Sequence, residues 1–235
     1  MNIEIWSDVV CPFCYIGKRR FEQALAQFPQ NDKIQVEWKS YQLMPEVKTQ
    51  PGRNMLEFFS EIKGVSLERA EVMHHQVTEM ARQSGLDYHF EKTIPANTFT
   101  AHRFIHHAKA HGKQDEAEEI LFRSYFTEGK NIDDLGVLLD LGKEIGLDTE
   151  PLKATLTGDT YTEDVRFDIY EAQQIGVSGV PFFVLDRKYA ISGAQDVNTF
   201  QQTIERAFNE WQKNNAETKL DTIEGASCTP DGECD

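Results

Sequence analysis

Alternating apolar and polar positions predict short β-strands near both ends of the chain. The segment Ile3–Trp6 alternates in this way and is followed by Ser7 and Asp8, which predicts a strand that ends in a turn. Residues 34–43 alternate similarly, which predicts a second strand that stops near Pro45. Strand patterns return only at residues 182–185 and 187–193, joined by a short turn at Asp186 and Arg187.

Helical periodicity fills the rest of the chain. From Cys14 onward, apolar residues fall on one helical face, and Pro29 marks the end of that helix. From about residue 52 to 158 the patterns are helical, with almost no strand signal. A further helix ends near Gly176, and a closing helix is capped by Asp196. After Trp211 the chain becomes polar and acidic.

This order of elements predicts an α/β protein with a thioredoxin fold and a long α-helical insertion. The predicted domains are a discontinuous thioredoxin-like domain (1–51 and 159–211), an inserted α-helical domain (52–158), and a flexible acidic tail with a cysteine pair (212–235).

Charge and composition exclude several function classes. The net charge of −15 argues against sequence-independent binding to nucleic acid and against binding to an anionic membrane surface. No apolar run approaches the length of a membrane span, and the first residues do not resemble a signal peptide. We therefore expect a cytoplasmic protein, in which a cysteine pair is catalytic, redox-sensing or metal-binding more often than structural.

The motif Cys11-Pro12-Phe13-Cys14 carries the candidate chemistry. It follows a predicted strand and opens a predicted helix, where unpaired N–H groups and the helix dipole favour a thiolate at Cys11. Cys14 would lie one turn inside the helix, able to attack a mixed disulfide formed at Cys11. Phe13 carries no charge, so we expect a less oxidising couple. Two buried structural cysteines, or half of a zinc site that needs two further ligands, remain alternatives.

Val180-Pro181 is the second candidate feature. A proline inside a run that otherwise reads as a buried strand is unusual, and X-Pro is where cis peptide bonds occur. With the cysteine motif upstream, a cis bond is the favoured interpretation. It would turn the Val180 backbone outward, where its N–H and C=O could pair with an extended peptide or with glutathione. An ordinary trans proline that starts a strand is the alternative.

The chain resembles the DsbA-like thioredoxin superfamily, and within it the FrnE-like cytoplasmic branch, which neighbours 2-hydroxychromene-2-carboxylate isomerases and kappa-class glutathione transferases. The matching stretches are SDVVCPFCYIGKRRFE, NTFTAHRF, GVSGVPFFV and ISGAQ. The resemblance implies thiol–disulfide oxidoreductase activity, with Cys11 as the attacking thiol, Cys14 as the resolving thiol and a cis Pro181 facing them. The isomerase and transferase relatives have serine where Cys11 stands. The strongly oxidising secreted members have a histidine where Phe13 stands, so the direction of the reaction stays open.

The resemblance also suggests substrate contacts. Pro12, Phe13 and Val180 would surround Cys11, and Asn97, Thr98 and His102 would line the opposite side of the cleft. It requires no bound cofactor, while glutathione stays open as a co-substrate. The expected partners are protein or small-molecule thiols and disulfides.

Two further groups of residues are candidates for other chemistry. Cys228 and Cys234 flank a Pro-Asp-Gly turn signal and could form a regulatory or relay disulfide, an independent disulfide, or free thiols without a role. His102 with His106, and His107 with His111, have the i, i+4 spacing of zinc ligands, but no third ligand is evident. We expect these histidines to form a polar or partly buried helical face.

The sequence therefore predicts a thiol–disulfide oxidoreductase. The alternatives are a glutathione-dependent isomerase or transferase, a redox-responsive binding protein, and a zinc-binding structural module.

Overall fold

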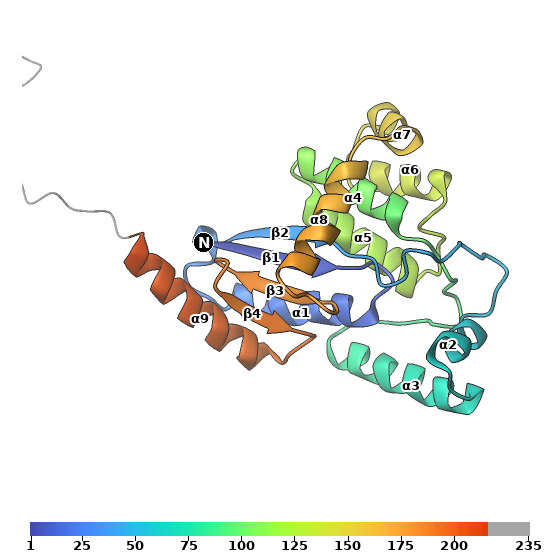
Figure 1. The fold of residues 1–235 in the computed structure, drawn as a ribbon, viewed down its shortest axis with the longest axis horizontal. Coiled ribbons are helices and arrows are strands. Elements are labelled where there is room, and N and C mark those ends of the chain that lie inside the picture. Colours follow the sequence, from blue (N-terminus) through green and yellow to red (C-terminus); the bar gives the residue numbers. More distant parts are fainter. Residues whose placement is uncertain (216–235) are drawn as a thin grey trace, which may run out of the picture.

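A four-stranded mixed sheet forms the centre of one half of the molecule in the computed structural model, which describes residues 1–215 (Figure 1). The strand order is β2-β1-β3-β4. The strands are β1 (Asn2–Ser7), β2 (Gln35–Ser40), β3 (Phe182–Leu185) and β4 (Tyr189–Ser192). The predicted tail begins at residue 212, but the last helix continues to Asn214. The rest of that tail from residue 216, with Cys228 and Cys234, lies outside the described residues.

The central strand β1 explains the register of the sheet. It pairs in parallel with β2 and antiparallel with β3, so that Ile5 lies beside Trp38 on one side and Phe183 on the other. All three side chains are buried in one core. Asp186 and Arg187, the residues of the predicted turn between β3 and β4, both have positive φ angles, as tight hairpin turns require.

The second strand is shorter than the pattern of residues 34–43 predicts. The last backbone bond to β1 is donated by the Tyr41 N–H to the Ser7 carbonyl, at 3.0 Å. The Leu43 N–H instead donates to the Asp8 carboxylate, at 2.8 Å. A side chain thus takes the place of the neighbouring strand, and the segment beyond Ser40 leaves the sheet.

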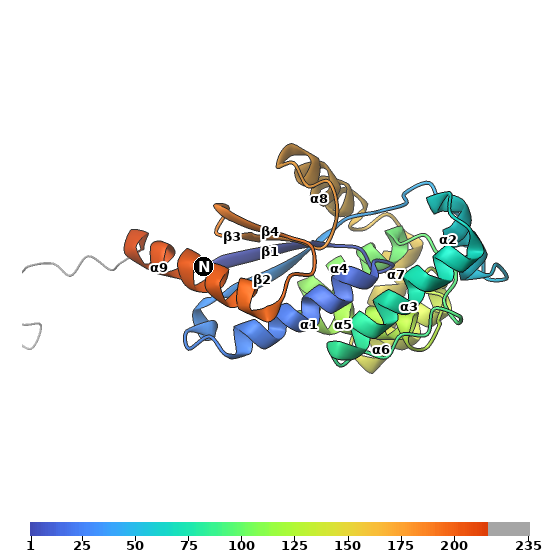
Figure 2. The same ribbon diagram turned by 90° about the horizontal axis from the view of Figure 1, so that it is seen from below.

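Helices cover both faces of the sheet (Figure 2). The first face packs against α1 (Pro12–Ala26) and α9 (Val197–Asn214), around an apolar core that includes Phe21, Phe200 and Phe208. The opposite face packs against α8 (Thr162–Gln174) through Trp6, Ala172 and Val184. The sequence predicted these helices because their apolar residues recur at helical spacing.

The predicted helical insertion lies between β2 and α8 in the chain. Its helices are α2 (Met55–Lys63), α3 (Leu67–Gln83), α4 (Phe99–Ala110), α5 (Gln114–Phe126), α6 (Leu135–Glu144) and α7 (Thr149–Thr157). Figure 1 shows α4–α7 as one group beside β2, whereas α2 and α3 form a separate pair near the N-terminal end of α1. Side chains cap several of these helices, as at Asn54, Ser66 and Asp134, whose oxygens each accept a backbone N–H of the first turn.

The helical insertion and the thioredoxin-like part share one hydrophobic core. That core contains Cys11, Cys14 and Ile16 from the start of α1 together with residues of the insert such as Phe104 and Leu121. Phe58 of α2 is buried as well. The exact limits of the two predicted domains stay a prediction, because the packing is continuous across them.

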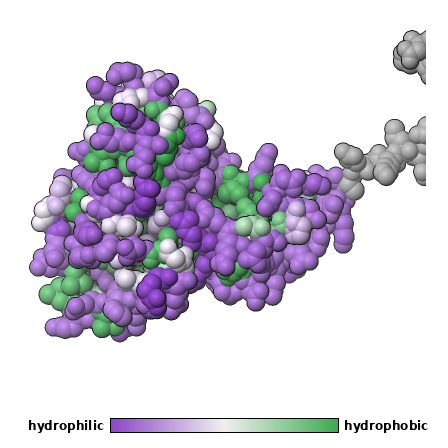
Figure 3. Space-filling view, turned by 180° about the vertical axis from the view of Figure 1, so that it is seen from behind, coloured by the Kyte–Doolittle hydropathy of each residue, from purple (hydrophilic) through white to green (hydrophobic). Residues whose placement is uncertain are grey.

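The outer surface is mostly polar. Figure 3 shows a largely hydrophilic face on which apolar residues gather in separate patches. Among residues 1–215, no helix combines the length and the apolar character that crossing a membrane would require.

Ion pairs of Lys18 link α1 to the insert. Its side chain is only 1% exposed, and its ammonium contacts the carboxylates of Glu22, Asp115 and Glu119. Burial lowers the pKa of Lys18, but these carboxylates outweigh burial and raise it. The ammonium also lies 5.7 Å from the centre of the Trp38 ring, a cation–π contact. The charge of Lys18 is therefore used between α1 and α5, and does not face the cysteines.

Replacing Lys18 with alanine should destabilise the protein by about 3 kcal/mol, at the low end of the range for breaking a buried ion pair, because the carboxylate partners are partly exposed. Arg19→Ala, at a half-exposed neighbour on the same helix, should cost about 1 kcal/mol or less. Urea unfolding of both variants measures the difference. Equal losses for the two variants would contradict the role given to Lys18.

Candidate active site

Cys11 lies at the start of α1, as the sequence predicts. It is the N-cap residue of the helix, with Pro12 in the first turn. Its backbone N–H donates to the Asp8 carbonyl at 2.9 Å, and its carbonyl accepts from the Cys14 N–H at 3.0 Å. The thiol is 3% exposed and donates to the Val180 carbonyl, with 3.4 Å between sulfur and oxygen. The turn before the helix thus holds Cys11 at the helix N-terminus, where the unpaired N–H groups favour a negative charge.

Cys14 is more deeply buried, at 1% exposure, and both cysteines are free thiols. Burial raises the pKa of the Cys14 thiol well above its usual range, and the neighbouring Cys11 raises it further. The Asp8 backbone N–H and the Ser7 hydroxyl act in the opposite direction. The raised pKa keeps Cys14 protonated unless its surroundings change to favour the thiolate. This suits a thiol that reacts second, after Cys11.

The Val180-Pro181 peptide bond is cis, which confirms the favoured interpretation of that motif. The loop is fixed from both sides. The Pro181 carbonyl accepts from the Gly193 N–H at 2.8 Å, and the Pro181 ring packs against Gly17 of α1. A β-carbon at position 17 would lie 3.0 Å from the Pro181 Cγ, so glycine allows this close approach. The loop therefore presents the Val180 carbonyl directly to Cys11.

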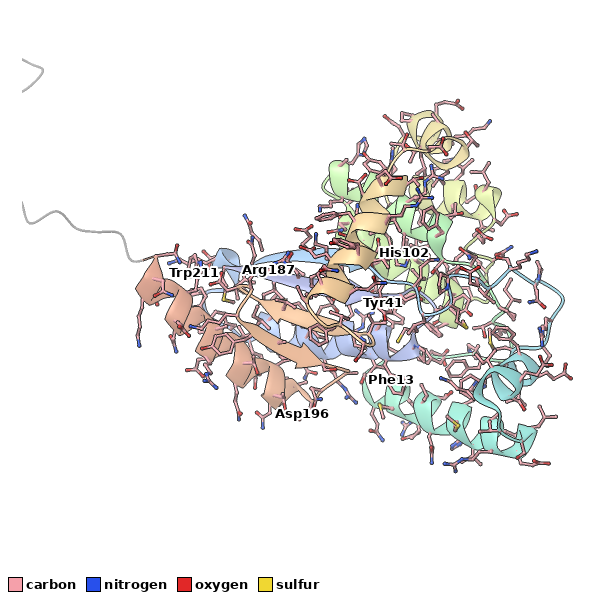
Figure 4. The ribbon with its side chains drawn as sticks, viewed as in Figure 1. Phe13, Tyr41, His102, Arg187, Asp196 and Trp211 are labelled. Atoms are coloured by element: carbon pink, nitrogen blue, oxygen red, sulfur yellow. The ribbon has the colours of Figure 1, made fainter. Side chains whose placement is uncertain are left out.

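The surroundings of Cys11 offer polar backbone and apolar side chains. Within residues 1–215, the Val180 N–H has no hydrogen-bond acceptor. Phe13 is 39% exposed and lies at the N-terminal end of α1 (Figure 4). Leu43 is also exposed, and its backbone is held to the active-site turn through the Asp8 carboxylate. The arrangement leaves an apolar rim and one free backbone donor next to a thiol.

Tyr88, in the loop after α3, is a site residue that the sequence reasoning missed. Its hydroxyl donates to the Pro12 carbonyl at 2.7 Å, and its ring stacks on Phe126. Burial raises the pKa of Tyr88, and the charge of Cys11 raises it further. A lone tyrosine that follows a helix carries no signal of such a contact, since the packing of the insert alone brings it to the motif.

Asn97 connects the predicted cleft to the segment after β2. Its side-chain amide donates to the carbonyls of Pro45 and Val47, and its oxygen accepts from the Phe99 N–H at the start of α4. The contact of Asn97 with substrate stays a prediction. In this conformation its polar atoms hold the 45–47 segment against α4.

His102 lies behind the active-site turn. It is 1% exposed, and its Nε2 atom donates to the Tyr41 carbonyl at 2.8 Å (Figure 4). The same nitrogen lies 3.5 Å from a carboxylate oxygen of Asp8. Its predicted contact with substrate also stays a prediction, and what the structure shows is a link between α4 and the turn that carries Cys11.

The other histidines of α4 have separate partners. His106 contacts Asp168 and the Ser40 hydroxyl, and His107 contacts Thr155. His111 Nδ1 bonds to the His107 carbonyl. Among residues 1–215, no group of three or more His, Cys, Asp or Glu side chains is placed to hold a metal ion.

The difference between the two thiols is directly measurable. Cys14 in a Cys11→Ser variant should be alkylated with a pH midpoint above the ordinary thiol value of about 8.5, because burial remains the main cause of its raised pKa. Mass spectrometry after timed iodoacetamide labelling over a pH series gives this midpoint. The same peptide in denaturant serves as the control and should titrate normally. A native midpoint at or below the denatured one would contradict the raised pKa.

Comparison with known proteins is consistent with this geometry. Residues 2–205 match the family model described as a DSBA-like thioredoxin domain. The crystal structure of a probable DsbA oxidoreductase from Streptomyces coelicolor is 36% identical, with a TM-score of 0.84, and the match covers 100% of this chain and 98% of that one. The uncharacterized protein YwbO of Bacillus subtilis (strain 168) is 28% identical over 206 residues, which cover 87% of this chain and 96% of YwbO.

A more distant structure shares the fold. The cytosolic disulfide reductase DsbM from Pseudomonas aeruginosa, solved with glutathione, is 18% identical with a TM-score of 0.61, over 91% of this chain and 100% of that one. With the cysteine pair at the start of α1, the cis proline opposite and the family match over most of its length, this chain belongs to the DsbA-like thioredoxin family.

Proposed function

We propose that the protein is a thiol–disulfide oxidoreductase that uses Cys11 as the attacking thiol and Cys14 as the resolving thiol. The observation that carries this proposal is the placement of the two sulfurs. Cys11 lies at the helix N-terminus against the Val180 carbonyl, and Cys14 is fully buried one turn further on. A helix N-terminus favours a thiolate, and the thiolate is the nucleophile of disulfide exchange.

The reaction proceeds in two exchanges. The Cys11 thiolate attacks one sulfur of a substrate disulfide, the S–S bond breaks, and the leaving thiolate takes up a proton. Cys14 then loses its proton and attacks the Cys11 sulfur, which releases the second substrate thiol and leaves a Cys11–Cys14 disulfide. A cellular thiol must reduce this disulfide before the next cycle. The same steps in reverse oxidise a substrate dithiol.

The Val180 backbone is the proposed docking point for substrate. An extended peptide placed beside Cys11 would donate to the Val180 carbonyl once the thiol is deprotonated, and would accept from the free Val180 N–H. Pro12 and Phe13, which follow Cys11 in the first turn of α1, would supply an apolar rim. These contacts fit an extended protein segment, and they also fit glutathione, which is a short peptide.

Several finer features belong to the same proposal. Phe13 brings no charge near Cys11, and Lys18 is neutralised at α5, so neither stabilises the thiolate strongly. This favours a reductase or isomerase over a strong oxidase. A reductase or isomerase fits a reducing cytoplasm and a role in oxidative stress. It also fits membership of the FrnE-like branch. No bound cofactor is required, and glutathione, which is present in the DsbM structure, is a reasonable source of electrons.

The second candidate function is a glutathione-dependent isomerase or transferase. The Val180 backbone, with its free N–H and its carbonyl beside Cys11, could hold the glutathione peptide in either case. The presence of both cysteines favours disulfide exchange, since the transferase chemistry needs no resolving thiol.

The cysteine pair at the C-terminus extends the proposal. Cys228 and Cys234 would receive a disulfide from the Cys11–Cys14 couple or regulate it. A Cys228→Ser, Cys234→Ser double variant with an unchanged redox potential and unchanged turnover on protein and small-molecule substrates would remove this relay.

Insulin reduction in the presence of dithiothreitol tests the main proposal. The wild-type protein should accelerate precipitation of the insulin chains, and Cys11→Ser should fall to the uncatalysed rate. Cys14→Ser keeps the attacking thiol, so it should also lose turnover but accumulate a mixed disulfide with insulin, visible by mass spectrometry. Retained insulin reduction in Cys11→Ser would contradict Cys11 as the attacking thiol. Activity of that variant on a glutathione-linked small molecule would favour the transferase.

Gly17→Ala tests the role of the Val180 loop. Alanine should favour the helix by about 1 kcal/mol, but its β-carbon forces the Pro181 ring to move by a few tenths of an ångström. We therefore expect a free energy of unfolding within about 1 kcal/mol of wild type, with insulin turnover reduced roughly three- to tenfold. Gly136→Ala, on the exposed side of α6, is the matched control and should leave turnover unchanged. Unchanged turnover in Gly17→Ala would show that the loop position does not limit the reaction.

A further inference from the structure

Three buried titratable residues next to the active-site turn have no role in the two exchanges described above. Asp8 belongs to the turn between β1 and α1, His102 to α4, and Glu118 to α5. All three side chains are almost completely shielded from solvent. Burying three ionisable groups together costs free energy of folding. Their presence in one core therefore suggests a function.

Contacts tie His102 and Asp8 to each other and to the segment after β2. Nε2 of His102 donates to the Tyr41 carbonyl at 2.8 Å and lies 3.5 Å from Oδ1 of Asp8. The other oxygen of Asp8 accepts from the Leu43 N–H at 2.8 Å. Figure 4 shows Tyr41 and His102 close together where the segment after β2 meets α4. Through His102, the insert thereby contacts the Asp8 carboxylate of the turn.

The backbone of Asp8 reaches both cysteines. Its carbonyl accepts from the Cys11 N–H at 2.9 Å, and its N–H acts on the Cys14 sulfur and lowers the pKa of that thiol. The residue whose carboxylate faces His102 thus also contacts both cysteines through its backbone.

The charges in this group change with pH. Burial lowers the pKa of His102, but the Asp8 carboxylate, supported by Glu118 and the Tyr41 carbonyl, outweighs burial and raises it. Burial raises the pKa of Glu118 to about 8, helped by the negative charges of Asp115 and Asp8 and opposed by His102 and by Lys18 of α1. Oε2 of Glu118 has no hydrogen-bond partner within residues 1–215. Tyr125 of α5 also faces Asp8, and burial keeps it neutral by raising its pKa.

We propose that His102 and Glu118 are positioning residues of the redox couple, with His102 balancing the charge of Asp8 and Glu118 switching that balance by gaining or losing a proton. This rests on the proposed function, since it assigns the control of the resolving step. With Glu118 protonated, His102 and Asp8 cancel, and a thiolate at Cys14 meets no net charge. Ionised Glu118 adds a negative charge to the group and opposes the second thiolate.

The resolving step can be isolated with an aromatic disulfide, dithiobis(nitrobenzoate), in protein that carries Cys228→Ser and Cys234→Ser, so that Cys11 and Cys14 are the only thiols of the chain. All proteins compared below carry these two changes, and wild type here means that background without a further substitution. The reduced protein releases one coloured thiolate when Cys11 attacks the reagent and forms a mixed disulfide. It releases a second when Cys14 loses its proton to solvent and attacks the Cys11 sulfur, which closes the Cys11–Cys14 disulfide. The second phase is intramolecular, so its rate does not depend on reagent concentration. Its pH profile reports the ionisation of Cys14 and of the groups around it.

His102→Gln keeps a donor for the Tyr41 carbonyl but cannot carry a positive charge. We expect it to slow the second phase on the order of tenfold near neutral pH, the effect of one pKa unit, with the first phase changed much less. His111→Gln makes the same chemical change at an exposed position one residue past α4 and should leave both phases unchanged.

Glu118→Gln replaces the protonated acid by a neutral group of the same shape, so it tests the switch in a fold that should be preserved. Its second phase should match wild type near neutral pH and become several-fold faster than wild type above about pH 8, where Glu118 ionises. Coincident pH profiles of Glu118→Gln and wild type would overturn the switch. An unchanged second phase in a folded His102→Gln would overturn the charge balance. A wild-type protein that releases only one thiolate would overturn the proposed function itself, which is a separate outcome.

Discussion

The interaction on which the rest of the site depends is the hold of Asp8 on the turn between β1 and α1. Its carbonyl fixes the Cys11 N–H, and its carboxylate accepts the Leu43 N–H and faces His102. One residue thus joins the end of the central strand, the segment that leaves the sheet, and the helical insert. A thiol at a helix N-terminus gains reactivity only if the turn before it is rigid, because the dipole effect falls off within the first turn. Asp8 supplies that rigidity through its three contacts, with Cys11, Leu43 and His102.

The sequence predicted the parts of the site that depend on local rules. A cysteine followed by proline at the start of an amphipathic helix has a strong local signature, and so has a proline at the entry of a buried strand. The contacts of Tyr88 with Pro12 and of Lys18 with α5 could not be predicted, because they join residues far apart in the chain through the packing of the insert. Lys18 shows this limit clearly. In the sequence it is a cation near the thiol, but its position around the axis of α1 directs it toward α5.

The same distinction explains the end of β2. Its alternation continues to Leu43, yet the strand ends at Ser40 because the Asp8 carboxylate captures the Leu43 N–H. Periodicity describes which side of a strand is buried, and it carries no information on whether a neighbouring backbone or a side chain receives each N–H. The histidines of α4 show a similar limit. Their i, i+4 spacing is compatible with metal binding, while in the fold each ring is directed to a different element.

In the proposed reaction, the shared core sets the chemistry of Cys14 as the resolving thiol. Cys14 packs among side chains of both the thioredoxin-like part and the insert, and burial is the main cause of its raised pKa. A buried thiol is protected from unwanted oxidation, but it must still ionise to release the product. The apolar insert therefore makes the second exchange slow unless polar groups lower the cost. Those groups are the Ser7 hydroxyl and the Asp8 backbone on the side of the turn, and the insert itself contributes His102 behind Asp8. The helical insertion thus shields both cysteines and, in the proposed reaction, also provides the charge that balances Asp8.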